Sequence, residues 1–247
     1  MIRIRGLRKV FPPDKVALDG VDLDISPGDC VMVIGQSGAG KTTLLRCLNR
    51  LVEPTAGEVR LNGSLVTGAS PEELRLVRRQ IGMIFQHFNL VKRASVLQNV
   101  LAGRLGHVPG LSSLVGRFPE RDRNLAMACL RQVGLEEFAS RRADTLSGGE
   151  QQRVAIARAL AQEPKVILAD EPTASLDPKL TESIMGILQR INIESRMTLV
   201  VSQHMLETAL TYGTRIVGLR QGRLVFDGTP HAITPTIVED IYRGGVQ

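Results

Sequence analysis

The chain opens with alternating apolar and polar positions. Ile2, Ile4 and Leu7 follow the two-residue period of a strand that buries one face. Residues 31–34 form a continuous apolar run, which is typical of a strand buried on both faces. Residues 58–61 precede an Asn-Gly pair and predict a further strand that ends in a tight turn. The first sixty residues are therefore predicted to be rich in β-structure.

The pattern becomes helical further along the chain. Residues 42–52 carry leucines at helical spacing, and Pro54 predicts the end of that helix. Residues 87–163 also favour helices. Residues 103–119 contain several glycines and prolines, so we expect a loop or a short helix there.

Strand-like runs return in the last third of the chain. They lie at residues 166–169 and 198–202 and in a hairpin over residues 215–227, whose turn is predicted near Gln221-Gly222. This order predicts an α/β core with a helical insertion. We expect a single domain over residues 1–247, in which a helical part, residues 87–163, interrupts a core made of residues 1–86 and 164–247.

Composition limits the classes of protein that fit. Of the 247 residues, 43% are apolar, only 3% are aromatic and none is tryptophan, so the core must be largely aliphatic. The formal net charge of +6 fits an anionic partner, and equally a solvated basic surface. Cys30, Cys47 and Cys129 lie far apart and form no CxxC pair. We therefore expect reduced, packed thiols and neither a metal site nor a disulfide framework.

No segment of the sequence is expected to enter a membrane. No apolar run approaches the ~18 residues that a membrane span requires. The alternating N-terminus lacks the apolar region of a signal peptide. We therefore expect a cytoplasmic protein that reaches a membrane only through a partner.

A glycine-rich segment joins the predicted strand at residues 31–34 to the next predicted helix. It matches the GxxxxGK[ST] phosphate loop, in which backbone N–H groups and the helix N-terminus surround phosphate oxygens. Lys41 is expected to reach the β- and γ-phosphates, Thr42 to ligate Mg²⁺, and Thr43 to contact the α-phosphate. The loop alone fits a kinase, a GTPase, a helicase or a transporter ATPase. Its residues are Gly35, Gln36, Ser37, Gly38, Ala39, Gly40, Lys41 and Thr42.

Two carboxylates end the apolar run at residues 166–169. Asp170 is expected to hold Mg²⁺ directly or through water, as in other phosphoryl-transfer sites. Glu171 is placed to polarise the attacking water as a general base. An acidic pair at a strand end is more often a cap or a solvated turn, so this interpretation depends on the phosphate loop.

A second anion-binding element is predicted where Ser147, Gly148 and Gly149 open a helix that runs to residue 161. A helix that starts with two glycines and a hydroxyl group presents unpaired N–H groups to an anion. In isolation, the same three residues fit a flexible helix cap equally well. The neighbouring motifs are therefore needed to choose between the two interpretations.

The ordered set of motifs resembles that of ABC-type ATPases over essentially the whole chain. The resemblance implies a P-loop NTPase (RecA-like) core with an N-terminal antiparallel β subdomain and an inserted α-helical subdomain. It implies ATP and Mg²⁺ as cofactors, and a head-to-tail dimer in which residues 147–149 bind the γ-phosphate of ATP held by a second copy of the chain. The motifs are the phosphate loop, residues 146–152, Asp170-Glu171, Ser175-Leu176-Asp177 and His204.

The resemblance also implies roles for four single residues. Gln86 looks like the glutamine that contacts Mg²⁺ and the attacking water and senses the membrane subunit. Asp177 looks like the acid that links the two ATP sites, and His204 like the switch histidine at the γ-phosphate. Phe11 is placed like the aromatic residue that stacks on adenine. A solvated glutamine, a capping histidine and a phenylalanine that anchors the core are the alternatives.

Finer resemblance points to an importer. Several segments are similar to the ATP-binding subunit of phosphonate importers, whose relatives take up phosphite or hypophosphite. Residues 201–205 depart from the Asn-Leu-His-Gln run expected of that family but keep the histidine. Residues 85–90 and 95–100 look like the Q-loop region of an importer. The segments similar to the phosphonate importer subunit are residues 101–106, 116–118, 142–144 and 161–164.

The importer interpretation implies specific partners. We expect an integral membrane permease that docks in the groove beside Gln86, a solute-binding receptor that selects the substrate, and no nucleic acid. The chain would then lie at the cytoplasmic face of the cell membrane. An ATPase subunit of an exporter or a cell-division system is the main alternative. A soluble ABC-type ATPase that acts on nucleic acid or ribosomes is a third class.

Overall fold

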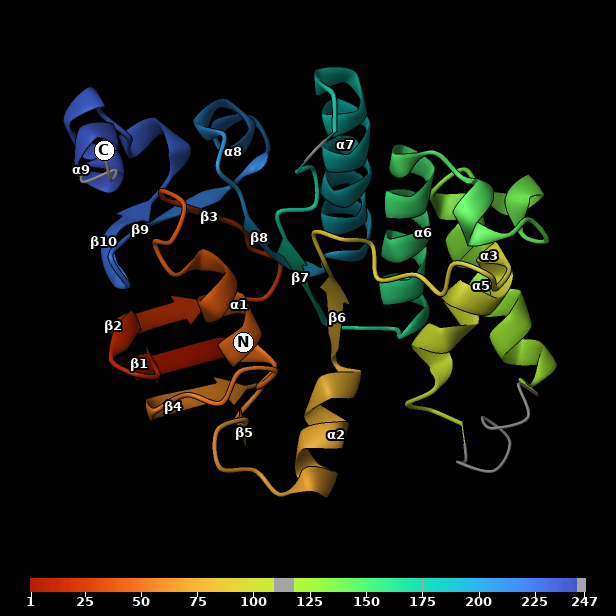
Figure 1. Cartoon of the computed structure of the whole chain (residues 1–247), viewed down its shortest axis with the longest axis horizontal. Coiled ribbons are helices and arrows are strands. Elements are labelled where there is room, and N and C mark those ends of the chain that lie inside the picture. Colours follow the sequence, from red (N-terminus) through yellow and green to blue (C-terminus); the bar gives the residue numbers. More distant parts are fainter. Residues whose placement is uncertain (109–117, 175, 244–247) are drawn as a thin grey trace.

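The computed structural model describes residues 1–108, 118–174 and 176–243. Its strands form two sheets (Figure 1). The strands are β1 Ile2–Phe11, β2 Lys15–Ile25, β3 Cys30–Ile34, β4 Ala56–Leu61, β5 Ser64–Leu65, β6 Ile81–Ile84, β7 Val166–Asp170, β8 Thr198–Ser202, β9 Arg215–Arg220 and β10 Arg223–Gly228.

The first sheet is antiparallel and has the order β2-β1-β4-β5. The second has the order β10-β9-β3-β8-β7-β6, in which β9, β3, β8, β7 and β6 run parallel and β10 pairs antiparallel with β9. The carboxyl ends of the parallel strands meet at one edge of this sheet, which is where ligands bind in open α/β sheets. Strands β3, β7 and β8 therefore bring their following loops together.

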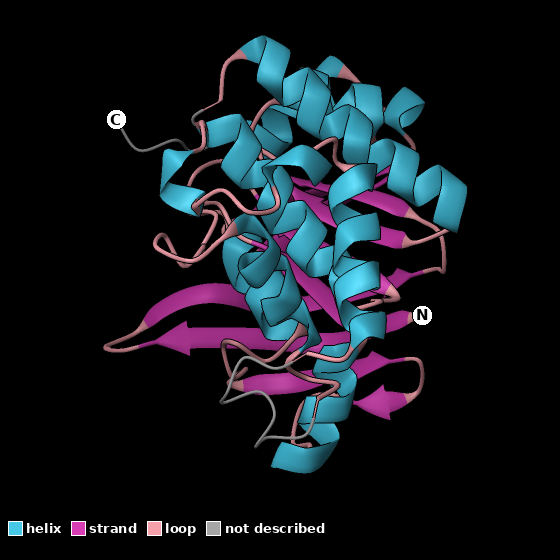
Figure 2. Cartoon of the chain, turned by 90° about the vertical axis from the view of Figure 1, so that its right-hand side faces the viewer, coloured by secondary structure: helices cyan, strands magenta, loops and turns pink. Residues whose placement is uncertain are grey.

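The helices cover both faces of the parallel sheet. Figure 1 shows α3, α5 and α6 gathered on the side away from the N-terminal sheet, and Figure 2 shows helices in front of the strands. None of the described helices combines the length and the apolar content that a membrane crossing requires. The helices are α1 Lys41–Leu48, α2 Pro71–Arg79, α3 Val96–Leu101, α5 Glu120–Gln132, α6 Gly148–Ala161, α7 Pro178–Ser195, α8 Leu206–Tyr212 and α9 Pro235–Tyr242, with short 3-10 turns at Ala102–Arg104, Glu136–Phe138, Ala143–Thr145 and Pro230–Ala232.

The alternation of side chains along β3 divides the core into two layers. Val31 and Val33 belong to the apolar cluster that includes α1 and the antiparallel sheet. Met32 and Ile34 belong to the cluster that includes α6 and α7. Successive strand residues point to opposite faces of a sheet, so a strand covered on both faces must be apolar at every position. This explains the continuous apolar run at residues 31–34.

Most of the predicted elements are confirmed, with small changes at their ends. Strand β7 extends the predicted run at residues 166–169 by Asp170, and β8 has the predicted bounds. The predicted turn between β9 and β10 is also confirmed. Gln221 and Gly222 have φ values of 48° and 78°, as a two-residue type I′ hairpin turn requires.

The helix predicted over residues 42–52 was too long. Helix α1 ends at Leu48, and Arg50 has a φ of 53°, a left-handed conformation that is typical of a helix end. Leu51, counted as part of the apolar face, is 49% exposed. The helical prediction from residue 87 was also too early, because α3 begins only at Val96, where Ser95 caps it.

The predicted loop at residues 103–119 is described in part. Residues Ala102–Arg104 form a 3-10 turn, and α5 begins at Glu120. Gly116 and Arg117, which contribute to the resemblance, lie outside the described residues, as does Ser175.

The three cysteines are buried and unpaired with one another, as predicted. Burial raises the pKa of Cys30 and Cys129 to about 11 and that of Cys47 to about 12. Thiols with such pKa values remain protonated near neutral pH and are poor nucleophiles. The cysteines therefore contribute to packing.

A buried ion-pair network ties the turn after α3 to two other helices. Arg104 Nε donates to Asp122 Oδ1 at 2.9 Å, and Nη1 donates to Glu163 Oε2 at 2.7 Å and to the carbonyl of Ala161 at 2.9 Å. Arg104 and Asp122 are both buried. A buried charge that loses its partner is strongly unfavourable.

Arg104→Ala is therefore expected to lower the free energy of unfolding by about 3 kcal/mol, because Asp122 is left as an unpaired buried charge. Chemical denaturation of the purified chain measures this loss. The double variant Arg104→Met/Asp122→Leu removes both charges and should recover most of it. An equal loss in the single and double variants would contradict the electrostatic explanation.

Candidate functional site

Close backbone contacts shape the glycine-rich loop after β3. Gly35 and Gly40 have φ values of 149° and 106°. A Cβ atom would lie 2.3 Å from the carbonyl oxygen of Leu219 at Gly35, and 2.5 Å from that of Ala17 at Gly40, so only glycine fits at either position. Helix α1 follows without a side-chain cap on its first N–H groups, which leaves them available to an anion.

The side chain of Lys41 is folded into this loop. Its ammonium group donates to the carbonyls of Gly35 at 2.8 Å and Gln36 at 3.0 Å, and lies 3.7 Å from Glu171 Oε1. Lys41 is only 4% exposed. Burial lowers the pKa of Lys41, and the nearby Glu171 opposes that shift. The loop thus combines a buried cation with a ring of backbone groups, which complements a phosphate.

Asp170 at the end of β7 is held on both carboxylate oxygens. Thr42 Oγ1 donates to its Oδ1 at 2.8 Å, and Ser202 Oγ donates to the same oxygen at 3.0 Å. Arg46 Nη2 lies 3.5 Å from Oδ2. Asp170 is 1% exposed, so these contacts fix its orientation. The structure thus brings together Thr42 and Asp170, two of the three side chains that the sequence placed at a magnesium ion. The third, Gln86, is exposed beyond β6 and makes no hydrogen bond with either of them among the residues that the structure describes.

Thr42 and Asp170 fit a magnesium ion that is bound together with a nucleotide. Mg²⁺ prefers oxygen ligands, and in phosphate-binding sites it takes one or two carboxylates together with phosphate oxygens and water. In the part of the chain that the structure describes, no group of three or more His, Cys, Asp or Glu side chains could hold a metal ion. Thr42 and Asp170 supply two oxygen atoms, so a magnesium ion held there would take its remaining ligands from phosphate oxygens and water.

Glu171 adopts an unusual backbone conformation beside the loop. Its φ is 45°, which is uncommon for a residue other than glycine. Its N–H donates to Ser202 Oγ at 2.9 Å, and its carboxylate faces Lys41. The side chain is partly exposed, so water can reach it. Backbone strain of this kind clusters at active sites, where surrounding contacts maintain it.

Ser147 begins α6 as an N-cap. Its Oγ accepts from the N–H of Glu150 at 3.4 Å, and the Glu150 carboxylate accepts from the N–H of Ser147 at 2.7 Å, which completes a capping box. The Ser147 hydroxyl also donates to the Glu150 carboxylate at 2.7 Å, and this bond, together with that from the Ser147 N–H, lowers the pKa of Glu150. A Cβ on Gly149 would lie 2.9 Å from Leu180 Cδ2, so a glycine lets α6 approach α7. The exposed Gly148 completes this segment.

The phosphate loop and the start of α6 are separated within one chain. Figure 1 shows α7 between α6 and α1 in this view. The helix that carries the predicted second anion-binding element thus lies apart from the helix that follows the phosphate loop. An anion held by both elements would need two copies of the chain.

The four residues that the resemblance singles out lie at or just beyond the ends of strands or at the start of a helix. Gln86 is exposed beyond β6, beside a groove of about 500 Å³. Asp177 is exposed and caps α7, since its Oδ1 accepts from the N–H of Leu180 at 3.0 Å. His204 is exposed after β8. Phe11 is half-buried at the end of β1, with its ring centroid 4.9 Å from the ammonium of Lys9.

Comparison with known proteins decides the family of the chain. Residues 18–174 match a family model described as ABC transporter. The chain belongs to the ABC transporter family. This ABC transporter chain is 50% identical over 242 residues to the phosphonates import ATP-binding protein PhnC 1 of Halalkalibacterium halodurans. The aligned region covers 98% of this chain and 94% of the relative. It is 51% identical over 247 residues to the phosphonates import ATP-binding protein PhnC of Shouchella clausii. There the aligned region covers 100% of this chain and 93% of the relative.

Solved structures of ABC cassettes are similar to the ABC transporter chain. The dimeric, post-hydrolysis state of the ATP-binding cassette MJ0796 bound to ADP and Pi has 36% identity and a TM-score of 0.80, and the match covers 94% of this chain and 100% of that one. The ADP conformation of MJ1267, an ATP-binding cassette of an ABC transporter, has 28% identity and a TM-score of 0.85, with 99% of each chain covered. These similarities confirm the predicted fold class.

Four residues of this ABC transporter chain that the sequence did not indicate contact the site. Ser202 and Arg46 contact Asp170, as described above. Gln203 and Tyr242 both bond the backbone of His204. Of the four, Ser202 had a usable signal, since a hydroxyl group ends an apolar strand beside β7. Arg46 and Tyr242 contact the site from elements that are distant in sequence. Gln203 is adjacent to His204, and only its bond to Thr173 joins distant segments.

Proposed function

We propose that this chain is the ATP-binding and ATP-hydrolysing subunit of an ABC importer for phosphonate or a related phosphorus oxyanion. The observation that carries the proposal is the hydrogen bond between Thr42 and Asp170, beside the ion pair of Lys41 in the phosphate loop with Glu171 after β7. The importer assignment is supported by the two relatives named as phosphonates import proteins, each about half identical to the whole chain.

Each side chain of the phosphate site then has a defined task. Lys41 and the loop N–H groups bind the β- and γ-phosphates of ATP. Thr42 and Asp170 would hold Mg²⁺, which supplies positive charge that neutralises the phosphate oxygens. Glu171 orients the attacking water and accepts its proton. Gln36, Ser37, Gly38, Ala39 and Thr43 complete the phosphate cradle.

Residues around the loop bind the remainder of the nucleotide and detect its state. Phe11 stacks on adenine, since β2, its hairpin partner, touches the phosphate loop at Gly40. His204 contacts the γ-phosphate, and Gln86 contacts the metal ion and the water. Asp177 links the two ATP sites of a dimer. These four roles follow the resemblance to ABC-type ATPases.

A second copy of the chain supplies the other half of each site. Ser147, Gly148 and Gly149 present the N-terminus of α6 to the γ-phosphate that the partner copy holds. The separation of α6 from α1 in Figure 1 supports this arrangement, and so does the dimeric state of the similar cassette MJ0796. ATP would then act as the link between two copies.

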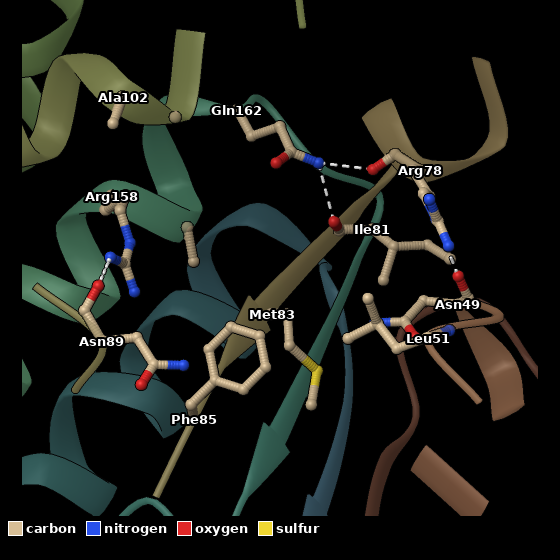
Figure 3. A pocket seen from close by; sticks show the side chains of 12 residues that line it. Asn49, Leu51, Arg78, Ile81, Met83, Phe85, Asn89, Ala102, Arg158 and Gln162 are labelled. Carbon is tan, nitrogen blue, oxygen red and sulfur yellow. Dashed lines mark hydrogen bonds between the residues drawn. The ribbon is translucent and has the colours of Figure 1, made fainter. Parts of the chain in front are cut away.

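The permease docks in a second groove, which shares Asn89 with the groove at Gln86 and lies between β6 and the helices that follow it. This groove has a volume of about 390 Å³, with Ile81, Met83 and Phe85 along its apolar floor (Figure 3). Arg158 forms one side, and the exposed Leu51 lies on the other. An amphipathic helix of a partner fits a groove of this kind. Because Gln86 directly follows Phe85, movement of the docked helix would be transmitted to the site.

Leu51→Glu is expected to reduce co-purification with the permease at least about 10-fold, because it places a charge in the apolar groove. ATP binding by the isolated chain should not change. Ile193→Glu is the matched control, since Ile193 is 68% exposed on α7 and lies outside the groove lining. Loss of permease binding in both variants, or in neither, would contradict this docking site.

Reconstitution with permease and receptor tests the transported substrate. Phosphonate, phosphite or hypophosphite should each be compared for stimulation of ATP turnover by the complete assembly in liposomes. Stimulation by at least one of the three, accompanied by its uptake, is expected. An assembly that responds to none of them but exports or imports another solute would contradict the proposal.

A further inference from the structure

Gln203 is a fully buried polar residue outside the family motifs. It follows β8 and has an exposure of 0%, so its amide must find partners within the protein. Its Nε2 donates to Thr173 Oγ1 at 3.1 Å. Its Oε1 accepts from the N–H of His204 at 3.0 Å and from that of Met205 at 3.5 Å. One side chain thus connects two loops.

Thr173 belongs to the turn that carries Glu171. The N–H of Ala174 donates to the carbonyl of Glu171 at 3.1 Å, which closes this turn, and Thr173 itself is buried. Any shift of the turn therefore moves the acceptor of the Gln203 amide. Through Gln203, the backbone of His204 is bound to the same turn that positions the Glu171 carboxylate.

The carbonyl of His204 is held from the opposite side. Tyr242 of α9 donates its hydroxyl to this carbonyl at 3.3 Å, and the backbone oxygen of Tyr242 accepts from the Gln36 side chain in the phosphate loop. Ile241 anchors α9 on β9, where it packs so closely that a Cβ on Gly218 would lie 2.7 Å from it. The backbone of His204 is therefore fixed at both its N–H and its C=O.

We propose that Gln203 is the positioning residue for His204, and that its amide makes the placement of the His204 imidazole depend on the Glu171 turn. This inference rests on the proposed function, in which His204 contacts the γ-phosphate and Glu171 orients the water. Catalytic groups must be held within about 0.5 Å of their productive geometry by surrounding contacts. A buried hydrogen-bond network in a low dielectric supplies such restraint.

Gln203→Leu removes the amide at similar side-chain volume and tests the link. It is expected to lower kcat for ATP about 10-fold with KM within about twofold, since a misplaced group affects the reaction more than nucleotide binding. Thr173→Val removes the acceptor alone and keeps the side-chain shape, so it should reproduce most of this loss. Steady-state ATP turnover of the full chain measures both variants.

A His204→Ala background separates positioning from a general loss of structure. If Gln203 acts through the histidine, Gln203→Leu should cause no further loss of single-turnover rate in that background. An equal fractional loss with and without His204 would overturn the inference, and so would a normal kcat in both Gln203→Leu and Thr173→Val.

The two proposals fail in different ways. A wild-type chain without ATP turnover would contradict the proposed function, and this inference with it. Turnover that requires His204 but is unaffected by Gln203→Leu and Thr173→Val would contradict only the positioning role.

Discussion

Glu171→Gln is expected to lower the rate of ATP turnover on the order of 10³-fold, because a general base contributes about 10²–10⁴-fold to such reactions. Glutamine keeps the size of the side chain but cannot accept the proton of the attacking water. ATP binding should persist, since the close packing at Gly35 and Gly40 and the Lys41 bond to the Gly35 carbonyl do not involve the Glu171 carboxylate. Single-turnover hydrolysis and equilibrium ATP binding measure the two quantities separately.

The same variant should also accumulate as an ATP-bound dimer, because hydrolysis no longer releases the two copies from each other. Size-exclusion chromatography with and without ATP detects this state. Glu182→Gln is the matched control. It makes the same chemical change at a position that is exposed on α7. If Glu171→Gln kept a turnover rate within about threefold of the wild type, the general-base assignment would be wrong.

Ser147→Arg is expected to reduce ATP turnover on the order of 10²-fold, because a bulky cation would occupy the γ-phosphate position at the start of α6. Its phosphate loop is intact, so each isolated copy should still bind ATP. ATP-dependent dimerisation should be lost. Turnover measured across a range of protein concentrations separates a dimerisation defect from a catalytic one.

Ser70→Arg is a closely matched control for this substitution. Ser70 caps α2 through the same capping box, with Glu73 in the place of Glu150, and it is also exposed. Both substitutions should lower the free energy of unfolding by about 1 kcal/mol, because each removes a helix cap. If the two variants showed the same ATP turnover, the effect of Ser147→Arg would come from lost stability. That result would contradict a site formed by the phosphate loop of one copy and Ser147 of another.

The core of the fold could be predicted because its signals are local. The apolar run at residues 31–34, the glycine-rich loop and the two carboxylates at the end of β7 are each a pattern of a few consecutive residues. Parallel strands then bring them together at one edge of a sheet, which is why the contact between Thr42 and Asp170 could be expected.

Other elements had signals that the periodicity alone did not reveal. Helix α2 is short and polar, but Ser70, Pro71 and Glu73 form a capping box with proline at the first helical position, which would have predicted its start. The helix over residues 42–52 was overestimated because Leu51 extends the apolar spacing although it faces solvent. Spacing alone does not distinguish a core leucine from one in a surface groove.

The contacts around His204 could not be predicted from the sequence. Tyr242 reaches the carbonyl of His204 across 38 positions, and Gln203 reaches Thr173 across 30 positions. Such pairs depend on how helices and loops pack against the sheet, and no local sequence pattern encodes that packing. The sequence did mark this segment as a departure from the expected family run, but it gave no reason why a glutamine occupies it.

The central claim is that the phosphate loop of one copy and Ser147 of another form one site. Mixing Lys41→Met with Ser147→Arg chains tests it most directly, because each variant alone disables both sites of its dimer. In a mixed dimer both defects fall in one site and the other site is intact. The account predicts that an equimolar mixture regains roughly a quarter of wild-type ATP turnover. Turnover in the mixture no higher than the mean of the two separate variants would contradict it.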